Sequence, residues 1–476
     1  MQDTWANSVP PSPRPSGAST VGFDLHVELT GPRVRAALEA ALREGVQTGR
    51  LAAGTRLPAT RTLAADLGIA RNTVADAYGQ LVAEGWLTAR QGSGTRVAEH
   101  ATGSNVRPAT AAARSRAPRF SLRPGLPDLS AFPRGAWLAA ARRALAAAPS
   151  EAFGYSDPCG RPELRTALAA YLARARGVRA TADQIVICSG FTQVLSLLGR
   201  VLAARGGAAM AVEAYGHQHH RDVIAASGLA VRPIPVDADG AVIDEVSGAA
   251  AVLLTPSHQF PLGMTLAPHR RTQAVQWAGR ARSVVIEDDY DGEFRYDRRA
   301  IGAMQPLAPE HVIYAGTASK TLAPAVRLAW IVVPGHLLGD VVEAKSLTDR
   351  HGSTLDELTL AELITSGGYD RHVRRSRLLY RRRRDRLLAA LADAAPRLRV
   401  TGVAAGLQAV VELAPGTQEA DVLEAAAARG LALDGMRAFC PAGVTYPEAL
   451  VLGYGTPAAH AFTTAVTRLC AVLRDH

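Results

Sequence analysis

Short apolar stretches alternate with segments of helical length through most of the chain after about residue 120, and this alternation restricts the fold more than any other feature. Buried strands that alternate with helices form parallel sheets with both faces covered. We therefore predict a large α/β domain with a mostly parallel central sheet. The candidate strands are Ile185–Cys188, Ala208–Val212, Leu229–Pro233, Ala250–Leu254, Val284–Glu287, Val312–Ala315 and Ala329–Val332.

Polar side chains follow four of these strands. In α/β folds, ligands bind at the carboxyl ends of the strands. Each stretch is a weak signal alone, because Ser-Gly turns are common and the run Glu-Asp-Asp is also compatible with a metal site or a solvated edge. The four together predict a binding site formed by Ser189-Gly190-Phe191, Gln259, Asp288 with Tyr290, and Lys320.

Lys320 lies in the segment GTASKTLAPAVR, residues 316–327, and is one of only two lysines among 53 basic residues. Its amine can form a Schiff base with an aldehyde cofactor, while Thr317, Ser319 and Arg327 hold that cofactor's phosphate. The alternative is an ordinary loop lysine. An aspartate such as Asp288 can keep a pyridine nitrogen protonated, and a tyrosine two residues on can hydrogen-bond the ring oxygen.

Residues 23–98 have the pattern of a separate DNA-binding domain. Apolar residues recur at helical spacing between 31 and 48, and helices are predicted for 60–67, which ends at Gly68, and for 71–84. Two short strands are expected around the tip of residues 91–94. Helix, short helix, turn, helix and β-ribbon make a winged helix-turn-helix.

The polar residues of this segment suit duplex DNA, because the first turn of the second helix can reach base edges and phosphates. A small protein-protein module is the alternative. The predicted DNA-binding residues are Arg56, Thr60, Arg61, Arg71, Asn72, Thr73, Arg90, Ser93, Gly94 and Thr95.

The remaining segments are less specific. Residues 1–22 are predicted to be a disordered tail and 99–118 a linker. The net charge of +10 weakly favours a polyanionic partner, and four scattered cysteines with no signal-like or membrane-spanning run predict a cytoplasmic protein without disulfides. No carboxylate or thiol partner at ligand spacing is evident near His217, His219 and His220, so no metal is expected. Nine arginines between 371 and 386 predict an amphipathic helix, or a second DNA-facing patch.

The segments GTRLPATRTLA (54–64) and ARNTVADAYGQLVAEGWLTARQGSGTRV (70–97) resemble the GntR-type winged helix. One position departs from that pattern. Ala70 occupies the place of the serine that usually caps the recognition helix, and its loss is expected to cost about 1 kcal/mol of local stability.

The motifs PSHQFPLG (256–263), EDDYDGEFRY (287–296) and YAGTASKTLAPAVRLAW (314–330) resemble fold-type I aminotransferases, and more narrowly the MocR/GabR regulators. The resemblance implies a fold-type I domain over 119–476 with a smaller C-terminal α+β subdomain. It implies pyridoxal 5'-phosphate (PLP) on Lys320, with Asp288, Tyr290, Ser189-Gly190, Thr317 and Arg327 around it. It also implies a head-to-tail homodimer in which Tyr155 reaches the partner's site.

Two departures bear on the ligand. The aromatic residue that stacks on the cofactor in the family corresponds here to His217, or to Tyr215 if the loop is rearranged. No arginine lies between Arg437 and Arg468, where the family commonly grips an α-carboxylate. The expected function is a PLP-dependent transcriptional regulator that senses an amine, an amino acid or PLP itself. The alternatives are an active aminotransferase with a DNA-binding appendage, and a PLP-independent repressor.

Overall fold

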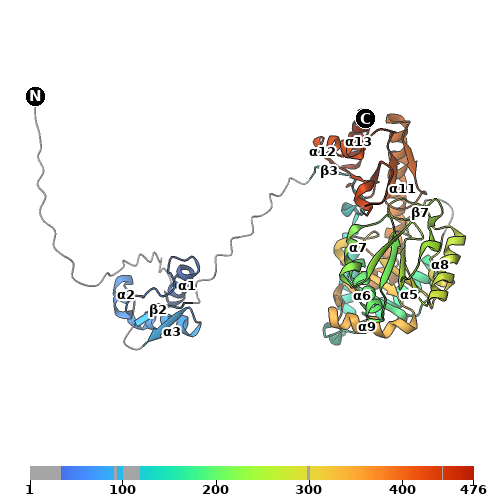
Figure 1. Cartoon of the computed structure of the whole chain (residues 1–476). Helices are drawn as coiled ribbons and strands as arrows, with labels where there is room; N and C mark the ends of the chain where they lie inside the picture. Colours follow the sequence, from blue (N-terminus) through green and yellow to red (C-terminus); the bar gives the residue numbers. More distant parts are fainter. Residues whose placement is uncertain (1–33, 91–93, 100–117, 297–300, 442) are drawn as a thin grey trace, which may run out of the picture. The chain divides into compact units, whose positions relative to one another are not determined.

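The computed structural model describes residues 34–90, 94–99, 118–296, 301–441 and 443–476 (Figure 1). The chain divides into two compact units, residues 1–116 and 117–476, each with hydrophobic cores of its own. Within the described ranges, no helix is both long and apolar enough to cross a bilayer.

The first unit is the predicted winged helix-turn-helix. It contains α1 (Val34–Gln47), α2 (Thr60–Leu67), α3 (Arg71–Ala83) and the antiparallel strands β1 (Leu87–Arg90) and β2 (Gly94–Val97). The helical spacing of Leu38, Leu42 and Val46 buries one face of α1 against Val74 and Tyr78 of α3. Ser93, one of the predicted DNA-binding residues, lies outside the described residues.

The turn before α3 has the chemistry expected from the sequence. Gly68 ends α2 in the left-handed conformation, with φ of 64°. Ala70 then adopts the extended conformation of an N-cap residue, with φ of −65° and ψ of 138°, but has no side-chain oxygen to accept a hydrogen bond from the helix. The first turn of α3 therefore begins without a side-chain cap.

We expect Ala70→Ser to stabilise the start of α3 by about 1 kcal/mol, because the hydroxyl can accept a hydrogen bond from an unpaired backbone N–H. Hydrogen exchange of the α3 amides in the full-length protein measures the gain. Ala75→Ser, at an exposed position inside the same helix, is the control and should destabilise by about 0.5 kcal/mol. Equal effects of the two variants would contradict the capping argument.

The second unit is organised around a seven-stranded sheet in the order β4-β12-β11-β10-β9-β5-β6. All seven predicted strands are present in it, and only β12 runs antiparallel to its neighbours. The strands are β4 (Ile185–Cys188), β5 (Ala209–Glu213), β6 (Ala230–Ile234), β9 (Ala251–Leu254), β10 (Val284–Asp288), β11 (Val312–Thr317) and β12 (Ala329–Val332).

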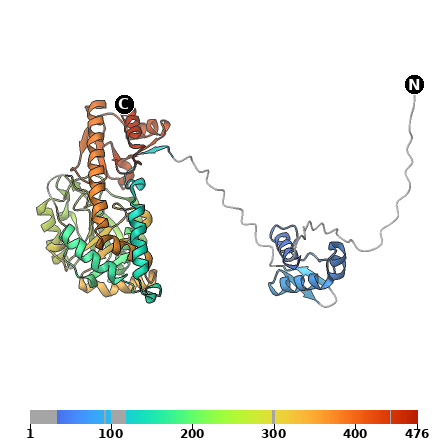
Figure 2. The same cartoon turned by 180° about the vertical axis from the view of Figure 1, so that it is seen from behind.

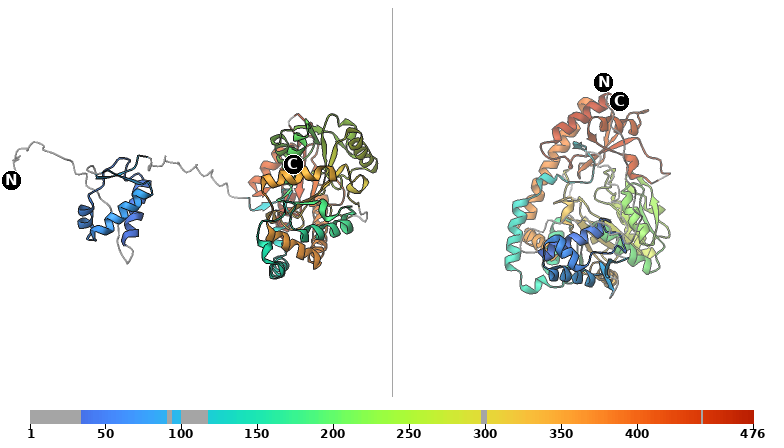
Figure 3. Two further views of the ribbon diagram at one scale, coloured as in Figure 1. Left: turned by 90° about the horizontal axis from the view of Figure 1, so that it is seen from below. Right: turned by 90° about the vertical axis from the view of Figure 1, so that its left-hand side faces the viewer.

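Helices cover both faces of this sheet (Figure 3). One face packs on α6 (Phe191–Ala204), α7 (Gln218–Ala226) and α9 (Gly335–Thr348). The other packs on α4 (Arg134–Ala147), α5 (Pro162–Arg176), α8 (Pro268–Ala281) and α10 (Thr354–Thr365). Burial on both faces explains why these strands are continuous apolar runs rather than alternating ones.

The C-terminal part forms the smaller α+β subdomain. Its antiparallel sheet contains β13 (Arg399–Thr401), β14 (Gln408–Glu412), β17 (Ala449–Gly453) and β16 (Asp434–Gly435), packed with α11 (Gly368–Ala394), α12 (Glu419–Ala428) and α13 (Phe462–Arg474). The long helix α11, orange in Figure 2, spans from the large sheet to this subdomain. Two further pairs of short strands are present. In one, β3 (Phe120–Ser121) pairs with β15 (Leu431–Ala432), and in the other, β7 (Val236–Asp237) pairs with β8 (Gly240–Ala241).

Candidate functional site

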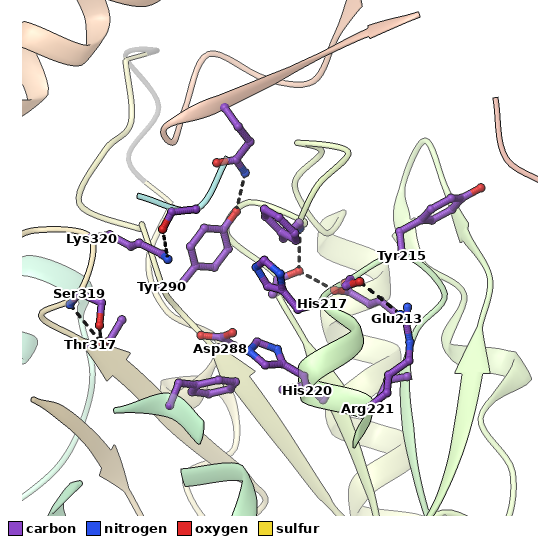
Figure 4. Close-up of a pocket in the computed structure, with 18 of the residues that line it drawn as sticks. Glu213, Tyr215, His217, His220, Arg221, Asp288, Tyr290, Thr317, Ser319 and Lys320 are labelled. Carbon is purple, nitrogen blue, oxygen red and sulfur yellow. Dashed lines mark hydrogen bonds between the residues drawn. The ribbon is translucent and has the colours of Figure 1, made fainter. Parts of the chain in front are cut away.

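A pocket with a cavity volume of about 130 Å³ lies at the carboxyl ends of β5, β10 and β11 (Figure 4). Eight predicted site residues line it: Phe191, Tyr215, His217, Asp288, Tyr290, Thr317, Ser319 and Lys320. Its lining also includes residues that were not among the predicted site residues, such as Glu213, His220, Arg221, Phe260 and Gln408. The topology of the sheet brings these segments together from positions more than 100 residues apart.

Lys320 presents its amine to the pocket. The Nζ atom donates a hydrogen bond of 2.7 Å to the carbonyl of Gly125. Burial lowers the pKa of this amine, while Asp288 and Asp291 oppose the shift. A lysine with a lowered pKa is a better nucleophile at neutral pH than an exposed one.

The three acids of the Glu-Asp-Asp run have different surroundings, and only Asp288 lines the pocket. Glu287 accepts hydrogen bonds from the backbone N–H groups of Met304 and Gln305. Asp289 is paired with the buried Arg176 at 2.6 Å.

Among the described residues, no side chain or backbone N–H donates to the Asp288 carboxylate. Burial raises its pKa well above the ordinary value, while Lys320 acts to lower it. A buried carboxylate that faces a pocket without a donor suits a ligand that carries a protonated ring nitrogen.

Arg176 holds together the loops beneath the pocket. Its guanidinium donates to both oxygens of Asp289, to Ser257 Oγ and to the carbonyls of Gly292 and Ile301. These partners belong to the loops that follow β9 and β10. The ion pair is fully buried, and such a pair is tolerated when its remaining N–H groups are also satisfied, as they are here.

Tyr290 links the pocket to the C-terminal subdomain. Gln408 of β14 donates to the Tyr290 hydroxyl at 2.9 Å. That hydroxyl also lies 3.1 Å from Nδ1 of His258, which is 2.8 Å from Asp291. Gln408 is separated from Tyr290 by 118 residues, so only the tertiary structure identifies it.

A second cluster contains the predicted phosphate ligands. Thr317 Oγ1 donates to Ser319 Oγ at 2.9 Å, and the guanidinium of Arg327 donates to the carbonyl of Ser189. Gly190 has φ of 90°, and a Cβ at this position would lie 2.8 Å from Nη1 of Arg327. Ser189, Gly190 and Arg327 are therefore in contact with one another, although they are outside the residues that line the pocket itself.

His217 is stacked on Phe260, with ring centroids 4.1 Å apart and planes 19° from parallel. In Figure 4 it points toward the middle of the pocket, whereas Tyr215 points away, and the Tyr215 hydroxyl donates to the carbonyl of Thr445. His220 lies 5.1 Å from the rings of both His217 and Phe191. Burial lowers the pKa of His217 to about 4 and that of His220 to about 3, so both are neutral at physiological pH.

Gln259 and Tyr155 do not line the pocket. The Gln259 amide is buried and donates to the carbonyls of Tyr215 and Phe260, so it fixes the loops beside the pocket. Tyr155 is 78% exposed, with the guanidinium of Arg350 3.8 Å above its ring. In the ranges that the structure covers, no group of three His, Cys, Asp or Glu residues could hold a metal ion.

Two family models match the chain. Residues 127–439 match the aminotransferase class I and II family, and residues 35–97 match the bacterial regulatory proteins of the gntR family. The probable rhizopine catabolism regulatory protein MocR of Rhizobium meliloti is 34% identical over 364 residues, which cover 72% of this chain and 74% of MocR. The pyridoxine biosynthesis regulator PdxR of Corynebacterium glutamicum is 31% identical over 428 residues, 87% of this chain and 90% of PdxR.

The chain belongs to the MocR subfamily of GntR-family transcriptional regulators.

The large unit of this MocR-type regulator has the aminotransferase fold. A solved structure of LysN, an α-aminoadipate aminotransferase from Thermus thermophilus complexed with N-(5'-phosphopyridoxyl)-L-leucine, matches it with a TM-score of 0.66 and 26% identity. The match covers 75% of this chain and 92% of LysN. Since the match to PdxR covers 87% of this chain, more than the aminotransferase-like unit alone, and the gntR family model matches residues 35–97, a regulator is favoured over an aminotransferase with a DNA-binding appendage.

The GntR domain implies that this MocR-type regulator binds DNA. At the start of α3, Arg71 and Asn72 are exposed and Thr73 is half-buried; at the start of α2, Arg61 is exposed and Thr60 half-buried. In the wing, Gly94 and Arg90 are exposed, Thr95 is half-buried, and the guanidinium of Arg56 lies against Gly94.

Glu213 gives the pocket a measurable pH dependence, because burial raises its pKa to about 7. Between pH 4.5 and 7 the folded protein keeps a proton that the unfolded chain releases, so this group lowers stability as pH rises through that window. We expect the stability of Glu213→Gln relative to wild type to rise across the window by at most about 3 kcal/mol and then level off.

Urea unfolding of both proteins at about pH 5, 6, 7 and 8 measures this difference. Glu310→Gln, at an exposed position, is the control and should show no trend. A constant difference between Glu213→Gln and wild type over this range would show that Glu213 ionises normally in the folded protein.

Proposed function

We propose that the pocket holds PLP attached covalently to Lys320, and that an amine or PLP itself, acting at this site, controls the binding of the winged helix to operator DNA. The observation that carries the proposal is the buried Asp288 carboxylate, which faces the pocket with no donor among the described residues and lies near the Lys320 amine. Burying a carboxylate without a hydrogen-bond donor costs free energy, and a cofactor with a protonated ring nitrogen would offset that cost.

The residues around the pocket match the functional groups of PLP one by one. Asp288 would accept from the ring N–H, and Tyr290, oriented by Gln408, would bond the ring oxygen. Thr317, Ser319, Arg327 and the Ser189-Gly190 backbone would hold the phosphate. His217 and His220, both neutral, would contact the ring. PLP supplies an aldehyde that reacts reversibly with amines.

The apolar wall beside the pocket restricts the effector. Val451, in β17, is buried in a cluster with Phe260, Tyr290 and Phe439. Arg221 lines the pocket, but its Nη atoms donate to the carbonyls of Ala214, Gly216 and Phe439, which leaves only its buried Nε without a partner among the described residues. We propose that the effector is PLP itself or an amine without a carboxylate, because a buried carboxylate needs a cationic partner.

We also propose that two copies associate head to tail in the cytoplasm, where chromosomal DNA is accessible. Tyr155 is 78% exposed, so its ring is accessible to a second copy of the chain, as this arrangement requires. Closure of the pocket around the effector would change the separation of the two winged helices, and with it the affinity for a two-part operator.

We expect wild-type protein, incubated with PLP and reduced with borohydride, to carry one covalent PLP group, and Lys320→Ala to carry none. Peptide mass mapping of the wild type contains its own control. The other lysine, Lys345, is buried and bonded to Asp349, so its peptide should stay unlabelled. Label on Lys345, or equal label in Lys320→Ala, would contradict the attachment site.

The coupling to DNA requires a second measurement. On an operator fragment selected from random duplexes by the wild-type protein, PLP or an active amine should change the affinity of wild type and leave that of Lys320→Ala unchanged. Fluorescence anisotropy of the labelled fragment measures both. If the DNA affinity of Lys320→Ala changed as that of wild type does, regulation would not depend on Lys320.

A further inference from the structure

The exposed side of α11 carries a stripe of six arginines that do not line the pocket and have no acidic partner among the described residues. At about 100° per residue, the six arginines named below lie within about 140° of the circumference of the helix. Asp385 and the 47% exposed Leu378 share that face. We call this set the arginine stripe: Arg371, Arg374, Arg375, Arg381, Arg382 and Arg386, all exposed.

Two other arginines of α11 have structural partners. Arg383 is buried and pairs with Asp128 at 2.6 Å, and Arg377 donates to the carbonyl of Glu293. Among the described residues, no acid forms an ion pair with any of the six in the stripe, and Arg371 alone bonds a backbone carbonyl, that of Ser366. Like charges one turn apart destabilise a helix, so the stripe costs stability in the absence of an anion.

The winged helix has a weaker cationic surface than its function suggests. Between residues 34 and 99 the sequence has eight arginines against six acids. Three of those arginines are paired, in Arg35–Glu39, Arg43–Glu84 and Arg50–Glu44. Affinity for duplex DNA depends strongly on the number of phosphates that a protein neutralises. In the described part of the chain, the stripe on the other unit is a larger block of positive charge without acidic partners.

We propose that the arginine stripe on α11 is a second DNA-binding surface, which contacts the phosphate backbone of duplex DNA. From Arg371 to Arg386 it extends about 22 Å, the length of about six base pairs. The stripe contacts phosphates rather than bases, so it binds DNA of any sequence.

An acidic protein is the competing occupant, and the composition of the stripe disfavours it. Protein interfaces depend on buried aromatic and aliphatic anchors. Leu378 is the single large apolar side chain on this face among the described residues. Guanidiniums spread along one helix face with almost no apolar surface match a polyphosphate better than a protein.

The test uses the full-length protein and a mixed-sequence duplex of about 40 base pairs. In Arg371→Gln/Arg375→Gln/Arg382→Gln, glutamine keeps the helix propensity and removes three charges. The matched control removes three exposed arginines on other elements, in Arg200→Gln/Arg232→Gln/Arg280→Gln. Circular dichroism and light scattering of both variants check fold and oligomeric state.

We expect the stripe variant to bind about tenfold more weakly near 0.15 M salt. The slope of log affinity against log salt is negative, and in the stripe variant its magnitude should decrease by about 0.9 for each phosphate that is no longer neutralised. The control variant should keep a slope near that of wild type. Equal losses in both variants would mean that only total charge matters and would overturn the proposal. Unchanged DNA binding with lost regulation in cells would assign the stripe to a protein partner instead.

A direct contact is tested by placing the photo-crosslinking residue p-benzoylphenylalanine at Leu378, in the middle of the stripe, with Leu347, 76% exposed on α9, as the control position. We expect a crosslink to the duplex from position 378 and none from 347. A crosslink from 378 to a second copy of the chain would make this face a subunit interface. That outcome, or the absence of any crosslink to DNA, would overturn the proposal.

Discussion

The geometry of the pocket depends on one buried ion pair, Arg176–Asp289. Arg176 joins the end of α5 to the loops after β9 and β10, and its ion pair occupies Asp289, the third acid of the Glu-Asp-Asp run. With Asp289 held by Arg176 and Glu287 held by backbone N–H groups, Asp288 is left as the acid that faces the pocket. The buried charged groups beneath the site are therefore held in position by the protein itself, without a ligand. Burying them costs desolvation free energy.

The central sheet was predictable from the sequence because strands buried on both faces are short, continuous apolar runs. The edge where the site lies was predictable for a related reason: polar residues that directly follow such runs must gather at one end of a parallel sheet. Residues outside that edge were not predictable in this way. Gln408 reaches Tyr290 from a different sheet, and Gly125 reaches Lys320 from an irregular segment. His220 was considered only as a metal ligand, because nothing local shows that its ring faces Phe191.

The structure shows where the two lysines and the many arginines of this chain are used. The chain has two lysines, and both are in defined environments: Lys320 in the pocket, and Lys345 fully buried in α9 beside Asp349. The remaining positive charge is carried by arginine, which stays ionised in any surroundings and spreads its charge over a planar group. Arginine therefore serves as the buried structural cation at Arg176 and Arg383 and as the exposed cation along α11.

The reversed direction of β12 brings two parts of the site into one short connection. Because β12 runs antiparallel to β11, the start of β12 lies beside the end of β11, with Thr317 opposite Ala329. The turn between them contains both Lys320 and Arg327, the residues proposed for attachment and for phosphate binding. One short loop would thus perform two chemically unlike tasks. An insertion or deletion there would displace both residues together, whereas a change in any other loop of the site would leave at least one of them in position.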